Sequence, residues 1–139
     1  MAVGPVNAAR ERGYYITSRD ADKEKETMSC IFCKIIGGEI PSDKVFEDET
    51  ILAFRDVSPV APAHILFVPK RHIASIAEIT PADAGLAGHI LVKIAETARS
   101  EGLDGGFRVV CNCGKDACQT VGHLHFHLIG GRGLTPKIG

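Results

Sequence analysis

Near the C-terminal end of the chain, large apolar side chains alternate with histidines. His123, His125 and His127 occupy every second position. In an extended strand, successive side chains point to opposite faces of the sheet. The pattern therefore predicts a strand over residues 122–129 whose three imidazoles share one surface. The opposite, core-facing row is Leu124, Phe126 and Leu128.

Shorter apolar runs predict the other strands of a sheet. The runs at residues 45–46 and 51–54 flank a polar turn, which is typical of a β-hairpin. Residues 64–68 form a third apolar run, bounded by Pro62 and Pro69, and prolines are common at strand ends. A further strand is expected over residues 107–111.

Two helices are predicted from spacing and capping residues. Residues 30–36 form a short helix that ends at Gly37 and Gly38. The longer helix starts at residues 80–83, where a threonine precedes proline and an acid. It continues to Gly102. Apolar residues recur along it at a spacing of four: Leu86, Ile90, Ile94 and Ala98.

The order of these elements is a short helix, three strands, a long helix and two strands. This order predicts an α+β domain with an antiparallel sheet of about five strands and the long helix on one face. The compact domain is expected over residues 28–139. Residues 1–27 end in a highly charged stretch and are expected to be an N-terminal extension, either partly disordered or foreign to the natural chain.

Composition narrows the class of protein. The 139 residues carry 16 basic and 17 acidic side chains and a net charge of -1, so no broad field favours nucleic acid or an anionic membrane as a partner. The longest strongly apolar run, residues 65–68, is far shorter than the roughly 20 residues that span a bilayer. Because residues 1–27 lack an apolar signal core, we expect a cytoplasmic protein with reduced thiols.

The histidines and cysteines allow several kinds of chemistry. A row of imidazoles can supply a nucleophile, a proton donor and an orienting partner, or it can bind a catalytic metal. The spacing of Cys30 and Cys33 suits one zinc ion with two distant histidines, although a pair of buried free thiols is the plain alternative. A second candidate metal cluster is Cys111, Cys113 and Cys118.

From residue 123 the chain fits the pattern His-φ-His-φ-His-φ-φ, and here it resembles the histidine triad (HIT) superfamily. The resemblance extends over roughly residues 31–132. Asn112 and the Gly130–Arg132 stretch resemble the Hint branch, whereas the dinucleoside polyphosphate hydrolase branch has glutamine in place of the asparagine. The C-terminus lacks the Trp-Pro-Pro ending of many Hint proteins, which leaves the leaving-group preference open.

The resemblance implies a purine nucleoside phosphoramidase that needs no catalytic metal. His125 would attack the α-phosphorus to give a nucleotidyl-histidine intermediate, which water then hydrolyses. The catalytic candidates implied are His125, His127, His64 and His123. The alternatives are a dinucleoside polyphosphate hydrolase, and a nucleotide-binding or scaffold module whose catalysis is secondary.

The resemblance also assigns the binding residues. Asp56 would accept the ribose hydroxyls, and Asn112, Thr120 and the loop around Cys118 would face the phosphate. An apolar cleft would hold the purine between Ile31, Phe32, Ile35, Ile40 and Phe54. A structural zinc ion would be held by Cys30, Cys33, His72 and His123. Family members form homodimers with one ten-stranded sheet.

Overall fold

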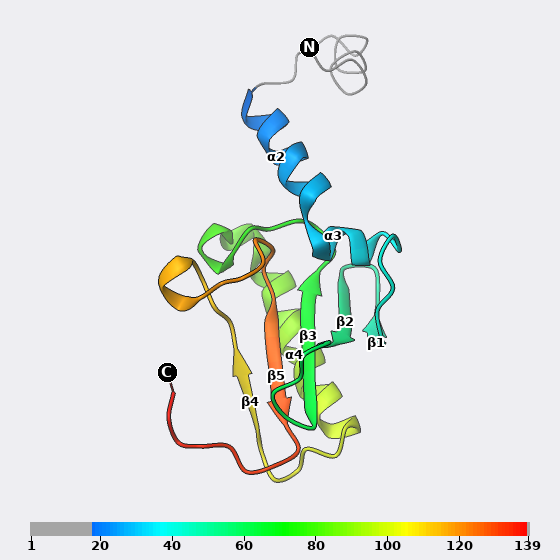
Figure 1. The fold of residues 1–139 in the computed structure, drawn as a ribbon, viewed down its shortest axis with the longest axis vertical. Coiled ribbons are helices and arrows are strands. Elements are labelled where there is room, and N and C mark those ends of the chain that lie inside the picture. Colours follow the sequence, from blue (N-terminus) through cyan, green and yellow to red (C-terminus); the bar gives the residue numbers. More distant parts are fainter. Residues whose placement is uncertain (1–17, 139) are drawn as a thin grey trace.

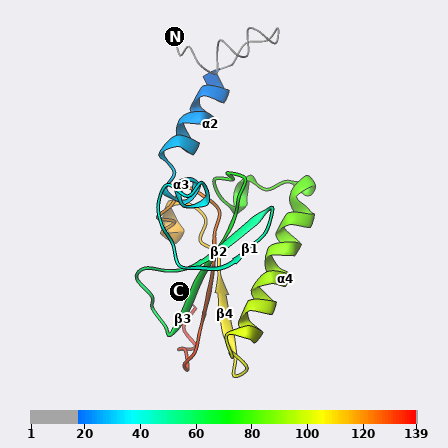
Figure 2. The same ribbon diagram turned by 90° about the vertical axis from the view of Figure 1, so that its right-hand side faces the viewer.

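The computed structural model describes residues 18–138, and their strands form a five-stranded antiparallel sheet in the order β1-β2-β3-β5-β4. The long helix α4 (Ala84–Ser100) lies along one face of this sheet (Figures 1 and 2). The expected α+β architecture is confirmed. The strands are β1 (Lys44–Glu47), β2 (Ile51–Arg55), β3 (Ala63–Pro69), β4 (Phe107–Val110) and β5 (Phe126–Gly130).

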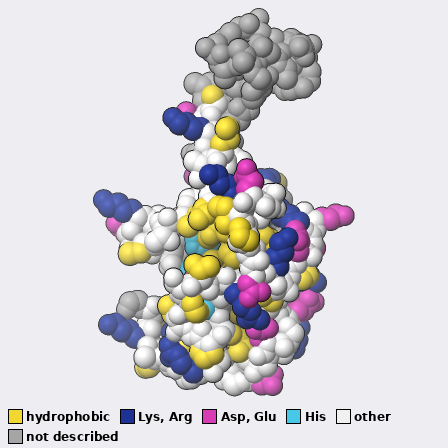
Figure 3. Space-filling view, turned by 45° about the vertical axis from the view of Figure 1, so that its right-hand side comes forward, with side chains coloured by type: hydrophobic (Ala, Val, Ile, Leu, Met, Phe, Trp, Pro, Cys, Tyr) yellow, Lys and Arg dark blue, Asp and Glu magenta, His cyan; other side chains and the backbone are white. Residues whose placement is uncertain are grey.

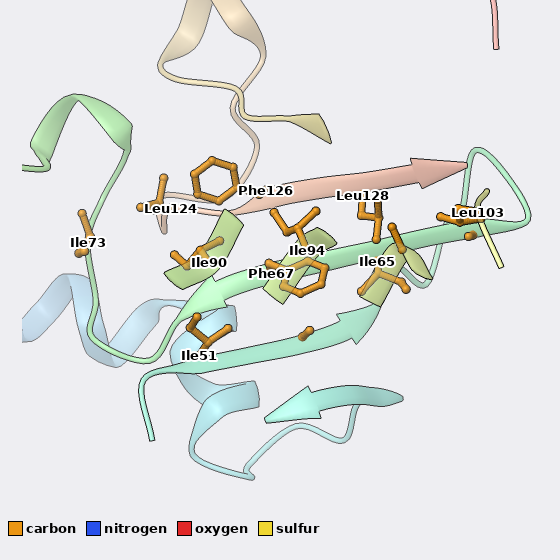
Figure 4. Packing of buried hydrophobic residues seen from close by; sticks show 13 residues of the cluster. Ile51, Ile65, Phe67, Ile73, Ile90, Ile94, Leu103, Leu124, Phe126 and Leu128 are labelled. Carbon is orange, nitrogen blue, oxygen red and sulfur yellow. The ribbon is translucent and has the colours of Figure 1, made fainter. Parts of the chain in front are cut away.

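The main core lies between α4 and the sheet. Ile90 and Ile94 of the helix pack in one cluster with Ile65 and Phe67 of β3 (Figure 4). The alternating row of the C-terminal strand belongs to the same cluster, as predicted. That row is Leu124, Phe126 and Leu128.

A second core covers the opposite face of the sheet. The short helix α3 (Ile31–Ile36) buries Phe32 and Ile35 there, against Phe54 and Leu66 of the strands. The sheet therefore separates two apolar layers. The histidines that alternate with the first layer face the second one, on the side of α3.

The C-terminal strand is shorter than the sequence pattern predicts. β5 begins at Phe126, after His123 and His125, whereas a strand from residue 122 is expected. Pairing ends at Phe67 opposite Phe126 on the β3 side and at Val110 opposite His127 on the β4 side, and the backbone N–H of Leu124 donates instead to the carbonyl of Ile73 at 2.7 Å. The chain bends at residues 121–123, before the strand begins.

The long helix starts as the capping residues predict, with one modification. Thr80 and Asp83 form a capping box, but the first turn is the 3₁₀ helix η2 (Pro81–Asp83), and α4 follows from Ala84. At the other end Gly102 has a φ of +73°, a conformation that glycine adopts without strain.

The N-terminal extension contains a helix. α2 (Ser18–Ser29), which includes the end of this extension, projects away from the sheet (Figure 1). Residues 1–17 lie outside the described residues. Within the described part of the chain, every helix is too short or too polar to cross a membrane.

Candidate active site

A cavity of about 290 Å³ opens on the α3 side of the sheet. Hydrophobic side chains gather there below α2, with histidine visible among them (Figure 3). Most of the residues predicted to bind the nucleotide, and two of the predicted catalytic histidines, line this cavity. They are Ile31, Phe32, Ile35, Ile40, Phe54, Asp56, Thr120, His125 and His127.

The apolar walls come from α3 and the centre of the sheet. The ring of Phe32 stands edge-on to Phe54, with centroids 5.6 Å apart, and edge-on to His125 at 5.1 Å. Several residues that line the cavity were not predicted from the sequence. Leu66 could have been, because it alternates along β3 with Ile65 and Phe67, which face the main core. The missed residues include Pro41, Ser42, Val57, Leu66 and Val121.

The hydrogen bonding of His125 defines its tautomer. Its Nδ1 atom lies 2.8 Å from the backbone carbonyl oxygen of His123. A carbonyl oxygen only accepts, so the neutral ring carries its proton on Nδ1 and leaves the lone pair of Nε2 available. His125 is thus oriented as a nucleophile would be.

His127 and His64 form a hydrogen-bonded pair. The backbone N–H of Val60 donates to Nδ1 of His64 at 3.1 Å, so the neutral His64 ring carries its proton on Nε2. That Nε2 lies 2.9 Å from Nδ1 of His127, which accepts the bond and keeps its own proton on Nε2. Burial lowers the pKa of His64 and lowers the pKa of His127 to about 4. Both rings are therefore neutral at pH 7.

Asp56 follows β2 and lies beside this pair. One carboxylate oxygen accepts the backbone N–H of Ser58 at 2.8 Å, and the other lies 3.4 Å from Nε2 of His64. Ligand atoms of Asp56, His64 and His127 all lie within 4.8 Å of one another. If the site held a catalytic metal, these three residues would supply its ligands. The ligand atoms of His123, His125 and His127 do not form such a group among the described residues.

His123 takes a different position from the other two histidines of the row. It is fully buried, and its Nε2 atom donates to the carbonyl oxygen of Pro69 at 2.8 Å. This bond leaves Nδ1 unprotonated, 3.4 Å from Sγ of Cys30. His123 therefore lies on the α3 side of the sheet, as the alternation predicts, but it faces the cysteines and is not part of the cavity lining.

The predicted zinc ligands converge at one point beside the cavity. The ligand atoms of Cys30, Cys33, His72 and His123 all lie within 4.8 Å of one another, with Sγ of Cys33 3.2 Å from Nδ1 of His72. Burial raises the pKa of Cys33 to about 12, so the thiol stays protonated unless a cation replaces the proton. Two sulfurs and two imidazole nitrogens fit a tetrahedral zinc ion.

The loop between β4 and β5 holds the remaining candidates. Thr120 reaches the cavity, whereas Asn112 and Cys118 are absent from its described lining. Gln119, which sequence reasoning did not assign, braces this loop by accepting from the backbone N–H of Gly114 at 2.9 Å and donating to the carbonyl of Ala74 at 2.8 Å. An amide side chain in a glycine-containing loop was the signal for such a brace.

The second cysteine cluster does not form a candidate metal site within the described residues. Cys111 packs against the main core, and burial raises the pKa of its thiol. Cys118 is exposed and has a φ of +59°, a left-handed conformation that favours glycine.

Solved structures of other proteins with this architecture align with most of the chain. A HIT family hydrolase from Legionella pneumophila is 47% identical and superposes with a TM-score of 0.78 over 80% of this chain and all of its own. A histidine triad protein from Clostridium difficile is 50% identical, with a TM-score of 0.77 over 80% of this chain and 97% of its own.

Curated relatives point the same way. An uncharacterised HIT-like protein of Synechococcus elongatus is 53% identical over 75% of this chain and 91% of its own length. A 14 kDa zinc-binding protein of Zea mays is 47% identical over 73% of this chain and 81% of its own length. Residues 37–134 match the family profile described as HIT domain. The chain therefore belongs to the HIT domain family.

Proposed function

We propose that this protein hydrolyses purine nucleoside 5′-phosphoramidates through a covalent nucleotidyl-histidine intermediate. The observation that carries the proposal is the tautomer of His125, whose Nδ1 donates to the carbonyl of His123 and whose Nε2 is free in a cavity with apolar walls and a carboxylate. The Legionella relative named as a HIT family hydrolase supports hydrolysis in general. Asn112 and the Gly130–Arg132 stretch favour the Hint branch.

The first step is attack by Nε2 of His125 on the α-phosphorus. A phosphorus–nitrogen bond forms to the ring as the bond to the substrate amine breaks, and the amine leaves with a proton. In the second step water attacks the phosphorus, the bond to His125 breaks, and the nucleoside monophosphate is released. Imidazole suits both steps because it is neutral at pH 7 and leaves readily.

His127 is our candidate for the proton donor. In the free protein, burial lowers its pKa to about 4, so it is neutral. A bound phosphate places negative charge beside the ring and favours the imidazolium form. His127 can then pass its Nε2 proton to the departing amine. The imidazolium also carries a proton on Nδ1, so the hydrogen bond that His64 donates to this atom in the free protein is given up in this step.

The other cavity residues bind the nucleotide. Phe32 and Phe54 present apolar surfaces to a purine, and Asp56 accepts hydrogen bonds from ribose hydroxyls. Thr120 donates from its hydroxyl toward the phosphoryl oxygens, where negative charge develops in the transition state. We extend this role to Asn112 and to the backbone N–H groups near Cys118.

We also propose that the buried cysteine and histidine cluster binds a structural zinc ion. Cys30 and Cys33 belong to the start of α3, His72 follows β3, and His123 precedes β5. A metal held by these residues would tie the N-terminal helices to the sheet, outside the cavity. The zinc-binding relative from Zea mays supports this assignment.

A second copy of the chain is the proposed protein partner. β4 is an edge strand of the sheet, and its Phe107 and Val109 are 44% and 40% exposed. Leu91 and Val92 of α4 are 52% and 54% exposed. Pairing of two β4 strands would join two sheets into one of ten strands and cover these apolar side chains.

The decisive experiment measures amine release from adenosine 5′-phosphoramidate by the purified protein. We expect turnover in the wild type, at least about a thousandfold less in His125→Ala, and near wild-type turnover in the control His89→Ala, whose ring bonds Asp48 away from the cavity. Dinucleoside polyphosphate is tested in parallel. Faster cleavage of that substrate, or AMP binding without turnover of either, contradicts the proposal.

A further inference from the structure

The hydroxyl group of Ser42 has no assigned role and no protein partner. Its Oγ atom is buried and lacks a hydrogen-bond partner among the described residues. Leaving a buried polar group unpaired costs free energy, and most such groups in folded proteins are paired. Ser42 also lines the candidate nucleotide cavity, so a bound molecule can supply the missing partner.

Ser42 and Asp56 both line the cavity, just beyond the paired ends of β1 and β2. Lys44 of β1 pairs with Phe54 of β2, and the backbone N–H of Arg55 donates to the carbonyl of Asp43 at 2.9 Å. Continued one residue beyond the Asp43–Arg55 bond, this register would set Ser42 opposite Asp56. Residues directly opposite in an antiparallel pair point to the same side, with Cβ atoms about 4.5–5.5 Å apart.

The neighbouring charged group is already engaged. Both terminal nitrogens of Arg55 bond the carboxylate of Glu101, at 2.8 and 3.1 Å, so its guanidinium is held at the end of α4. Around Asp56 the cavity is lined by two other polar side chains, Ser42 and His127, and the imidazole of His127 lies close to the carboxylate. The remaining walls nearby are apolar, including Ile40 and Phe54.

The two polar groups complement each other chemically. The carboxylate of Asp56 only accepts hydrogen bonds, whereas a serine hydroxyl both donates and accepts. A pair of vicinal hydroxyls offers two donors and two acceptors within a short distance. A carboxylate beside a hydroxyl matches a ribose diol better than it matches the edge of a purine or a phosphate.

We propose that Ser42 is a second ribose-binding residue, which acts with Asp56 to select ribonucleotides over deoxyribonucleotides. The inference rests on the proposed nucleotide site. Rotation of the Ser42 side chain to another staggered position turns Oγ from its buried location toward the ligand. The hydroxyl then donates to or accepts from one of the two ribose hydroxyls.

The test compares the affinity of AMP, 2′-deoxy-AMP and 3′-deoxy-AMP for the wild type and for Ser42→Ala. We expect Ser42→Ala to weaken AMP binding about three- to tenfold and to leave the affinity for one of the deoxynucleotides unchanged. The exposed Ser58, whose backbone N–H but not side chain bonds Asp56, supplies the control variant Ser58→Ala, which should bind all three ligands as the wild type does.

Thermal unfolding separates ligand binding from a structural role. Removal of an unpaired buried hydroxyl should leave the melting temperature of the free Ser42→Ala protein equal or higher, while reducing the increase produced by AMP. An equal loss of affinity for all three nucleotides, no loss, or a lower melting temperature of the free variant overturns the inference. A wild type that binds no nucleotide overturns the proposed function with it.

Discussion

Nε2 of His64 lies 2.9 Å from Nδ1 of His127, although the two residues are 63 positions apart in the sequence. The bond joins neighbouring strands β3 and β5, and the backbone N–H of Val60 sets its direction by donating to the far nitrogen of His64. The proton of His127 is thereby held on the nitrogen that His64 does not contact. His64 is a positioning residue in this arrangement.

Replacement of His64 should affect catalysis more than binding. His64→Ala removes the donor to His127, so we expect the rate of the chemical step to fall about ten- to a hundredfold, with the Kd for AMP changed by about twofold or less. His64→Gln keeps an N–H donor and should recover part of the loss. Single-turnover kinetics checks this, and equal rates for the two variants would contradict a positioning role.

The protein should lose stability as the pH falls from about 6.5 to about 4. His127 binds a proton in this range when unfolded but not when folded, because burial lowers its pKa from 6.5 to about 4. The unfolded state therefore binds more protons, and unfolding becomes more favourable by at most about 1.4 kcal/mol per pH unit for this group. Urea titrations at several pH values measure the slope. His127→Gln should show a smaller slope than the wild type.

Removal of the proposed zinc ion should lower the melting temperature. We expect a decrease of about 5–15 °C on treatment with a strong chelator, because the cluster connects α3 to the loops around His72 and His123. Cys33→Ser should show the same decrease and no further response to chelator. Elemental analysis should find about one zinc per chain in the wild type and in the control Cys118→Ser, whose thiol is exposed. Metal retained by Cys33→Ser would refute the assignment.

Phe54 should contribute to both stability and base binding. It is buried, and its ring packs against Phe32 with centroids 5.6 Å apart. Phe54→Ala removes this packing and should reduce the free energy of unfolding by about 3–5 kcal/mol. Phe54→Leu keeps most of the apolar volume, so it should remain folded and still bind AMP more weakly than the wild type. Urea denaturation and AMP titration provide the two measurements.

Much of the site follows from local sequence. The alternation from His123 to Leu128 indicates which side chains face the core, because side-chain direction in an extended chain depends only on position. The capping residues Thr80 and Asp83 likewise mark the start of the long helix, because a cap is a contact between near neighbours. These features depend on interactions over a few residues and can be predicted without the fold.

Other features depend on contacts between distant segments. Sequence patterns predict the order of the elements, the apolar row and, through the family resemblance, the chemistry expected of the histidines. Contacts in the folded protein set His123 against Cys30, bring His64 to His127 and place both Ser42 and Asp56 at the cavity. Strand pairing and hydrogen bonds bring together residues that are far apart in the chain. The neighbours of each site residue, and the tautomer of each histidine, therefore depend on the folded sheet and cannot be predicted from a local pattern.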